Sequence, residues 1–332
     1  MTASHPRLDP PAKKKSAHVG PLGAASRYYL QIIVVVLAGI LSLVIPTFST
    51  GYNIQNILTQ ASFSGLIACG MTLLIAGGLF DLSVAGMLAV VAVVTANVLP
   101  HSTIGLAIVT ALVTGTVLGV INGLVVTKAG ISPFIATLGM FNVYLALAFI
   151  LSGGQVVPIP SVHFQQLGTM KVAGIPLVFL VFAFVCLGSH FLLHLTHFGR
   201  RLRAVGSSET AARMAGIRVD RVKITAFAVT GLFTAVAAVG LSGLLSSANA
   251  TMASGMELSA IAIAVVGGTA LRGGQGTLLG TFTAALFMTM ISTALNLLQV
   301  SSYWQYIATG IILIVSLILG SLRRGDVVRG AS

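Results

Sequence analysis

The sequence predicts an all-α polytopic membrane protein with about ten transmembrane helices. Of its 332 residues, 56% are hydrophobic and only 7% are charged, and the mean hydropathy is +1.01. A soluble chain of this length could not cover its surface with so few charges, whereas lipid requires none. Ten apolar stretches follow one another, and 17 of the 18 Lys and Arg residues fall between them on one side of the membrane. The net charge of +12 therefore reports loop orientation and does not indicate nucleic-acid binding.

The apolar stretches set the expected spans. They lie at 28–46, 54–76, 83–99, 105–127, 133–151, 175–195, 224–246, 258–271, 277–298 and 303–320. Most approach the ~20 residues that a hydrocarbon layer of about 30 Å requires, and the eighth is short. Residues 1–27 are polar and basic, which predicts a disordered cytoplasmic tail, and no apolar segment precedes them as in a signal peptide.

The basic residues fix the orientation of the spans. With the amino terminus inside, the cytoplasmic segments hold five in the tail, Lys128, seven in the loop 200–223, Arg272, and three in the C-terminal tail 323–332. Only Lys171 falls outside. Adding or removing one span would reverse every later loop and destroy this asymmetry. We therefore expect both termini in the cytoplasm, with residues 28–322 forming one transmembrane domain.

Cysteine and histidine residues give weak signals of chemistry. Cys69 and Cys186 both lie within expected spans, where they are more typical of small packing residues than of a disulfide or a metal site. His190, His194 and His197 share a helical face at the cytoplasmic end of the sixth span. Their spacing permits a shared metal, but interfacial histidines without a nearby carboxylate or thiol are the simpler interpretation.

Two glycine-rich segments interrupt the apolar runs at membrane depth. One begins with Gly77 and Gly78, and the other contains Gly267, Gly268, Gly273 and Gly274. The two pairs correspond at an offset of 190 residues and follow spans of the same direction, which weakly suggests a parallel internal repeat. Irregular backbone at this depth survives only inside protein or beside a water-filled cavity.

Asp81 and Glu257 are the only acidic residues close to an expected span. A carboxylate in a membrane is costly unless it is paired or solvated, so each is a functional candidate. Structural roles are the alternative, because Asp81 can cap the helix that begins near Ser83 and Glu257 can lie in water at the outer mouth of the eighth span.

Several activities lack support in the sequence. No G-x-x-x-x-G-K-[ST] motif occurs, so the chain is not expected to hydrolyse ATP by itself. Ser-His-Asp, HExxH and CxxC arrangements are likewise missing, so an enzyme active site has no sequence support. We expect no cofactor to be bound by this chain.

The longest cytoplasmic loop, 197–223, contains a short expected helix. Ser207 or Ser208 can cap it, Glu209 lies in its first turn, and Gly216 ends it. Small residues at Ala211, Ala212 and Ala215 suit docking against a partner, and Glu209 can pair with Arg213 four residues on or with the partner. The alternative is a solvated connector.

Taken together, these motifs resemble the membrane permease subunits of bacterial ATP-binding-cassette (ABC) sugar importers, of the ribose, xylose, galactose and autoinducer-2 type. The most specific segments are 196–200, 204–206, 211–217, 222–223, 257–258, 260–262, 265–269 and 273–277, and further matches occur at 70–72, 81–84, 122–123 and 133–140. Where the family usually reads Gly-Gly-Ile-Asp-Leu-Ser-Val-Gly, this chain has Leu79 at the second glycine and Ala85 at the last.

The resemblance implies a vitamin-B12-permease-like fold (type II ABC importer) in the bacterial inner membrane. It implies a second permease copy or paralogue, an ATPase subunit with two domains in tandem that binds ATP and Mg²⁺, and a periplasmic or lipid-anchored sugar-binding protein. The helix from Ser208 to Ala215, ended by Gly216, would then couple to the ATPase. One alternative is an ABC permease for branched-chain amino acids. A less favoured one is an ion-coupled secondary transporter, because such a protein uses buried carboxylates to bind its ions and this chain has few near its spans.

A sugar pathway is expected to combine aromatic and small polar groups, since a sugar has apolar faces and a hydroxyl rim. The candidates lie at helix breaks or on adjacent spans: Phe80, Asp81, Ser83, Asn122, Phe134 and Thr137. The longest outer loop, 153–173, is expected to contact the binding protein.

Overall fold

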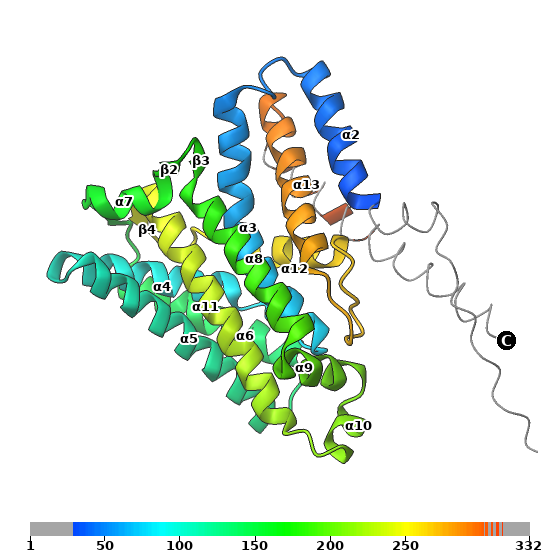
Figure 1. Ribbon diagram of the computed structural model, residues 1–332. Helices are drawn as coiled ribbons and strands as arrows, with labels where there is room; N and C mark the ends of the chain where they lie inside the picture. Colours follow the sequence, from blue (N-terminus) through cyan, green and yellow to red (C-terminus); the bar gives the residue numbers. More distant parts are fainter. Residues whose placement is uncertain (1–28, 302, 305–306, 308–309, 312–313, 315–332) are drawn as a thin grey trace, which may run out of the picture.

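The computed structural model describes residues 29–301 and residues 303, 304, 307, 310, 311 and 314. The tails expected at 1–27 and 323–332 lie outside the described residues, as does most of the tenth expected span. Within the described part the chain forms a bundle of long helices, with two minimal two-stranded sheets at one end (Figure 1).

The long helices follow the expected order of spans. They are α2 (Tyr29–Val44), α3 (Gly51–Ala76), α4 (Val84–Val98), α5 (Ile104–Lys128), α6 (Pro133–Ser152), α8 (Leu177–Leu195), α11 (Val219–Leu245), α12 (Met256–Val266) and α13 (Leu278–Leu297). A 3₁₀ turn, η1 (Leu99–His101), extends α4. In the described part, seven helices are long and apolar enough to cross a membrane, and α2 and α12 are shorter. These helices confirm a polytopic membrane protein.

The expected eighth span was too long at its end. It was placed at 258–271, but α12 ends at Val266 because Gly267 and Gly268 stop it. Residues 267–277 then form an irregular connection to α13. A helix of 11 residues at ~1.5 Å per residue is too short to cross the hydrocarbon layer.

The connections contain structure that the apolar pattern does not predict. At one end lie α7 (Val162–Thr169) and the strands β1 (Val157–Pro158), β2 (Lys171–Val172), β3 (Ile175–Pro176) and β4 (Ser247–Ala248). β1 pairs with β4, and β2 with β3, in both cases antiparallel. At the other end, the loop 197–223 folds into two helices, α9 (His197–Ser207) and α10 (Glu209–Met214).

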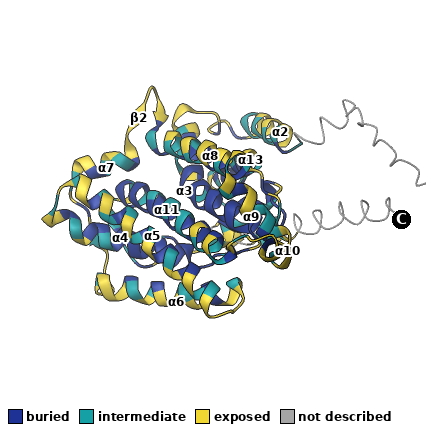
Figure 2. Cartoon of the chain, turned by 60° about the horizontal axis from the view of Figure 1, so that its bottom comes forward, coloured by how far each residue is buried: buried dark blue, intermediate teal, exposed yellow. Residues whose placement is uncertain are grey.

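The helices α3 and α11 occupy the centre of the bundle, as the burial colours show (Figure 2). α3 packs against α8, α11, α12 and α13, while α11 packs against α3, α4, α5 and α7. Every residue from Leu66 to Ala76 on α3 is buried. α6 lies at the edge of the bundle and exposes one apolar face (Figure 2).

Small residues allow α5 and α11 to pack closely. Gly115, Gly119 and Gly123 recur every four residues on α5 and face α11. A Cβ atom added at Gly123 would lie 2.7 Å from the Cα of Ile224, so larger side chains would separate the helices. Close backbone approach of this kind is the usual way in which membrane helices associate, because lipid offers no hydrophobic drive between them.

Candidate functional site

Asp81 forms a buried polar cluster at the break between α3 and α4. Its Oδ1 accepts hydrogen bonds from the backbone N–H of Ser83 at 2.9 Å and from the Ser83 hydroxyl at 2.6 Å. The side-chain amide of Asn122 on α5 donates to Oδ1 and Oδ2 at 3.3 and 3.1 Å. Asp81 is completely buried, so these donors replace the water that a carboxylate requires.

The cluster extends to α6 through Tyr144 and Thr137. The Tyr144 hydroxyl donates to Oδ1 of Asn122 at 2.9 Å, and the Asn122 amide also reaches the Ser83 hydroxyl at 2.6 Å. The backbone N–H of Leu82 donates to the Thr137 hydroxyl at 3.1 Å. Four expected pathway residues are thus brought together in one cluster that joins α4, α5 and α6.

Tyr144 was missed by the sequence reasoning, although a signal existed. It lies seven residues after Thr137 on α6, a spacing that puts both side chains on one helical face. Phe80 and Phe134 are the other two candidates. Phe80 is half-buried near the break, whereas Phe134 lies in the first turn of α6 and is 52% exposed. Phe134 therefore lies on the exposed surface of the helix bundle and is not part of the cluster.

The two glycine breaks have the same backbone geometry. At the end of α3, Leu79 N–H donates to Leu74 C=O at 2.9 Å, and at the end of α12, Thr269 N–H donates to Ala264 C=O at 3.1 Å. Gly78 and Gly268 follow the helices with φ of +73° and +91°, a left-handed conformation that favours glycine. These positions correspond at the offset of 190 residues, but the same cap also ends α6 at Gly153 and α10 at Gly216, so it does not by itself indicate a repeat.

This geometry explains why Leu79 is tolerated where the family has glycine. The left-handed residue of the first break is Gly78, and Leu79 does not have a positive φ. Its side chain is 1% exposed and packs in the core. The two breaks also touch, since Gly274 N–H donates to the C=O of Ala76 at 2.9 Å.

The short helix expected in the cytoplasmic loop is present as α10. The Ser208 hydroxyl caps it by accepting from Ala211 N–H at 3.3 Å, and Gly216 follows it with φ of +78°. Glu209 binds two cations of this chain: Lys223 on α11 at 2.6 Å and Arg213 at 2.9 Å. Arg213 also binds Asp220 at 2.9 Å. The Lys223 ammonium, followed by the Arg213 guanidinium, lowers the pKa of Glu209 below its ordinary value.

One part of the α10 expectation was wrong. Ala212 was placed on a face that packs against a partner, but its side chain is 3% exposed and packs within the core of this chain. Ala211, Arg213 and Ala215 are exposed as expected. The sequence reasoning missed Met214, which ends the helix with 86% of its surface exposed. An apolar residue so exposed in a charged loop gains from burial by another protein.

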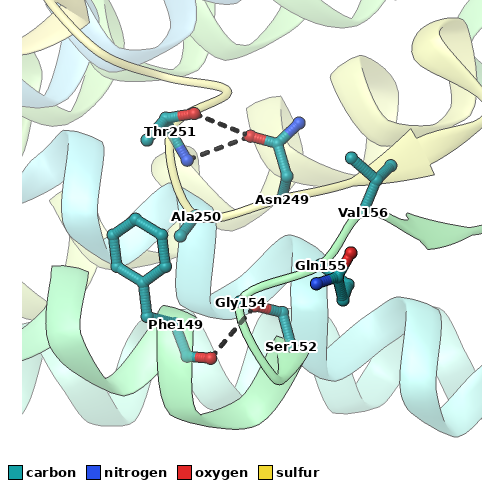
Figure 3. A pocket seen from close by; sticks show the side chains of 8 residues that line it. All are labelled: Phe149, Ser152, Gly154, Gln155, Val156, Asn249, Ala250 and Thr251. Carbon is teal, nitrogen blue, oxygen red and sulfur yellow. Dashed lines mark hydrogen bonds between the residues drawn. The ribbon is translucent and has the colours of Figure 1, made fainter.

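The opposite end of the molecule carries a small pocket of about 240 Å³ (Figure 3). It is lined by Phe149, Ser152, Gly154, Gln155, Val156, Asn249, Ala250 and Thr251. The side chain of Asn249 accepts from the N–H and the hydroxyl of Thr251, which fixes the rim (Figure 3). The pocket combines one aromatic ring with several hydrogen-bonding groups.

The remaining candidates lie outside both the Asp81 cluster and α10. Cys69 and Cys186 are free and buried, and the Cys186 thiol donates to Leu278 C=O at 3.3 Å. Glu257 lies in the first turn of α12, where the helix dipole favours an anion, but its Oε2 atom is buried and has no hydrogen-bond partner among the described residues, so the carboxylate does not lie freely in water as expected. The rings of His190 and His194 lie 4.6 Å apart.

Comparison with known proteins identifies the family. A family model described as a permease component of branched-chain amino acid transport systems matches residues 53–317, nearly the whole membrane region described above. The chain belongs to this permease family. No solved structure matches the permease.

Curated relatives of the permease are sugar transport proteins by name. It is 39% identical over 298 residues to the ribose import permease protein of Bacillus subtilis, covering 88% of this chain and 91% of the relative. It is 36% identical over 294 residues to the ribose import permease protein of Haemophilus influenzae, covering 86% and 90%. It is 36% identical over 305 residues to the L-arabinose ABC transporter permease protein of Azospirillum brasilense, covering 91% and 89%.

Proposed function

We propose that this permease is the membrane subunit of an ABC importer that moves a monosaccharide inward across the bacterial inner membrane. The observation that carries the proposal is the similarity, over most of both chains, to permeases named for ribose and for L-arabinose. Both sugars are pentoses, so the preferred substrate class is a pentose. The chain itself is not an enzyme in this proposal, because ATP and Mg²⁺ bind to the ATPase subunit.

Transport of a branched-chain amino acid is the second candidate. It is favoured by the description of the family model that matches residues 53–317. ATP-dependent uptake into vesicles that contain the permease, its ATPase and its binding protein separates the two candidates. Uptake of labelled ribose or L-arabinose and no uptake of leucine supports the sugar proposal, whereas uptake of leucine alone overturns it.

The proposed complex contains more than one permease subunit, and each has a defined orientation in the membrane. It contains two permease copies or paralogues, each with ten helices in a vitamin-B12-permease-like arrangement and with both termini in the cytoplasm. Lys171 lies before α8 and the basic helix α9 follows it, so they are at opposite ends of this helix (Figure 1). The basic end is then cytoplasmic, and the end with α7 and the pocket faces the binding protein.

The ATPase contact is proposed to centre on α10. Its exposed surface is formed by Thr210, Ala211, Arg213, Met214 and Ala215. Met214 is the proposed central contact residue, because a flexible apolar side chain can fill a groove of a partner and its transfer out of water is favourable. Glu209 has a different role, since its carboxylate is occupied by Lys223 and Arg213 and holds α10 against α11.

Two variants of Met214 test this contact. Met214→Asp places a charge in the contact and is expected to abolish co-purification of the ATPase subunit, while the permease still accumulates in the membrane because the side chain lies outside the core. Met214→Leu keeps an apolar anchor and should retain co-purification. Met170→Asp is the control at the opposite end of the bundle, because Met170, before β2, is also an exposed methionine, although less so at 51%. Normal ATPase association of Met214→Asp would place the contact elsewhere, such as the loop around Arg272.

A further inference from the structure

Gly206 lies at the point where both helix breaks meet α9. It is the penultimate residue of this helix. A Cβ atom added at Gly206 would lie 2.7 Å from the backbone N of Gly274 and 2.9 Å from the carbonyl carbon of Gly77, and it would overlap the carbonyl oxygen of Ala76. Only a residue without a side chain fits between these two segments.

The residues that face Gly206 show the same close approach to its backbone. A Cβ atom at Gly273 would lie 2.9 Å from the Cα of Gly206, and one at Gly78 would lie 3.5 Å from it. The hydrogen bond from Gly274 N–H to Ala76 C=O, at 2.9 Å, joins the two breaks beside this point. The end of α3, the connection 267–277 and α9 therefore touch backbone to backbone at Gly206.

The rest of α9 is held firmly as well. Leu202 and Val205 are buried, and the Cδ1 atom of Leu202 would lie 2.5 Å from a Cβ added at Gly77. α9 continues directly into α10 at Ser208, whose side chain caps α10, and the Lys223–Glu209 ion pair fixes α10 on α11. A displacement at Met214 can thus reach both breaks through elements that are tightly packed.

We propose that Gly206 is a positioning residue that makes α9 and the two glycine breaks move as one body, so that a movement imposed on α10 reaches both breaks together. This inference rests on the proposed function, in which the ATPase moves α10. Packed contacts of this kind shift as units and do not deform gradually, because interiors are close-packed. A side chain at position 206 would separate α9 from the breaks and leave α10 moving alone.

Gly206→Ala is the first test, in the complex with the ATPase and the binding protein. We expect the ATPase to co-purify and ATP to be hydrolysed, while the amount of labelled ribose or L-arabinose taken up per ATP falls by about tenfold, a typical size for coupling between sites. A purely structural role would lower assembly, hydrolysis and uptake together. Gly188→Ala on α8 is the control, because an added Cβ meets open space there.

Gly77→Ala gives a graded comparison. Its new Cβ meets the flexible end of the Leu202 side chain, so the neighbour can move aside and the loss of uptake per ATP should be smaller than for Gly206→Ala. Wild-type uptake per ATP in Gly206→Ala would overturn the inference.

A disulfide between cysteines introduced by Ser207→Cys and Gly274→Cys tests the shared movement without depending on the Gly206→Ala variant. The Cβ of Ser207 lies 3.5 Å from a Cβ placed on Gly274, within the ~3.5–4.5 Å range of disulfides. With Cys69 and Cys186 replaced by alanine, the bond should form under oxidation and uptake should persist, because the two segments move together. Gly274 has a φ of +80°, which strains a cysteine at this position, so the test is read only from protein in which the cross-link has formed. Loss of uptake that a reductant restores would show that the contact opens and would overturn the inference.

The two proposals fail in distinguishable ways. If the wild-type complex takes up leucine with ATP and neither sugar, the proposed function is wrong. If the wild type transports sugar but Gly206→Ala transports with the same yield per ATP, or the disulfide blocks uptake, only the role of Gly206 is wrong.

Discussion

The side-chain amide of Asn122 donates to both carboxylate oxygens of Asp81, at 3.3 and 3.1 Å, from a different helix. Asp81 belongs to the break after α3, whereas Asn122 lies in the last third of α5. Both side chains are completely buried. The contact therefore fixes the break against its neighbouring helix and satisfies a carboxylate that has lost its water.

Asn122→Ala should destabilise the permease through Asp81. Removal of the amide leaves a buried carboxylate short of donors, a defect that costs about 1–3 kcal/mol. The melting temperature of the purified protein in detergent should fall accordingly. The control is Asn142→Ala on α6, because Asn142 is exposed and donates only within its own helix, to Leu138 C=O. Equal melting temperatures for the two variants would contradict a stabilising role for the cluster.

The ion pair between Glu209 and Lys223 predicts a pH-dependent stability. The pKa of Glu209 is lowered by Lys223 and Arg213 from an ordinary value of 4.5, so the charged carboxylate stabilises the folded state above that pH. This contribution is lost as the pH falls through the lowered pKa. Because Glu209 is partly exposed, solvent screens the pair, and we expect a modest effect of about 0.2–1 kcal/mol.

Glu209→Gln measures this contribution. The variant should melt at a lower temperature than the wild type near neutral pH, and the difference should vanish well below pH 4.5. A double-mutant cycle with Lys223→Met isolates the pair, since Glu209→Gln should cost less when its partner is already absent. A difference that grows toward low pH would have the wrong sign and would exclude the ion pair as its cause.

The order of the spans could be predicted from the sequence because lipid imposes a long apolar run on each of them. The eighth was extended too far because residues 269–271 are apolar or small, although Gly267 and Gly268 already signalled the end of a helix. At this position the paired glycines are a better guide to the end of the helix than the hydropathy of the residues that follow. The break itself was predicted correctly, since paired glycines interrupt helices irrespective of the tertiary fold.

Other features depend on tertiary contacts that the sequence does not display. Ala212 has the same residue type as the exposed Ala211 and Ala215, and only the packing of α10 shows that it faces inward. α9 was missed because Gly199 and Gly206 weaken a helical pattern, yet Gly206 is required by the close approach of the breaks. The coming together of Asp81, Ser83, Asn122 and Thr137 likewise depends on how α4, α5 and α6 are arranged.

Phe80 and Phe134 are the two aromatic candidates for the sugar pathway. Phe80 and Phe134 offer faces on which the apolar side of a sugar can stack, and neither is fully buried. Replacing both with alanine should lower uptake of ribose or L-arabinose more than it lowers protein accumulation. Phe184→Ala is the control, because Phe184 on α8 is 78% exposed on an apolar helix face. Normal uptake by the double variant would remove both residues from the pathway.

The proposed orientation of the bundle predicts which residues are accessible from outside. Lys171 and Arg213 lie beyond opposite ends of α8. Lys171 is the first residue of β2, before this helix, and Arg213 is on α10, after it. In a background without Cys69 and Cys186, a cysteine at position 171 should react with an impermeant maleimide in intact cells. A cysteine at position 213 should react only after the membrane is opened. A labelled position 213 beside a protected position 171 would invert the topology.

The pocket at the Lys171 end predicts where the binding protein docks. Gly154, Gln155 and Val156 belong to the loop 153–173, which is proposed to face outward, and line the pocket together with Asn249 and its neighbours. A protein loop could bury an apolar group against Phe149 and find hydrogen-bonding partners at the rim. A photo-crosslinking residue at position 155 should therefore react with the purified binding protein, and one at position 102, in the short turn after η1, should not. The cross-link should be absent when the binding protein is omitted or replaced by an unrelated one, because the contact depends on a complementary surface. Cross-links from position 102 alone would place the docking site at the turn between α4 and α5.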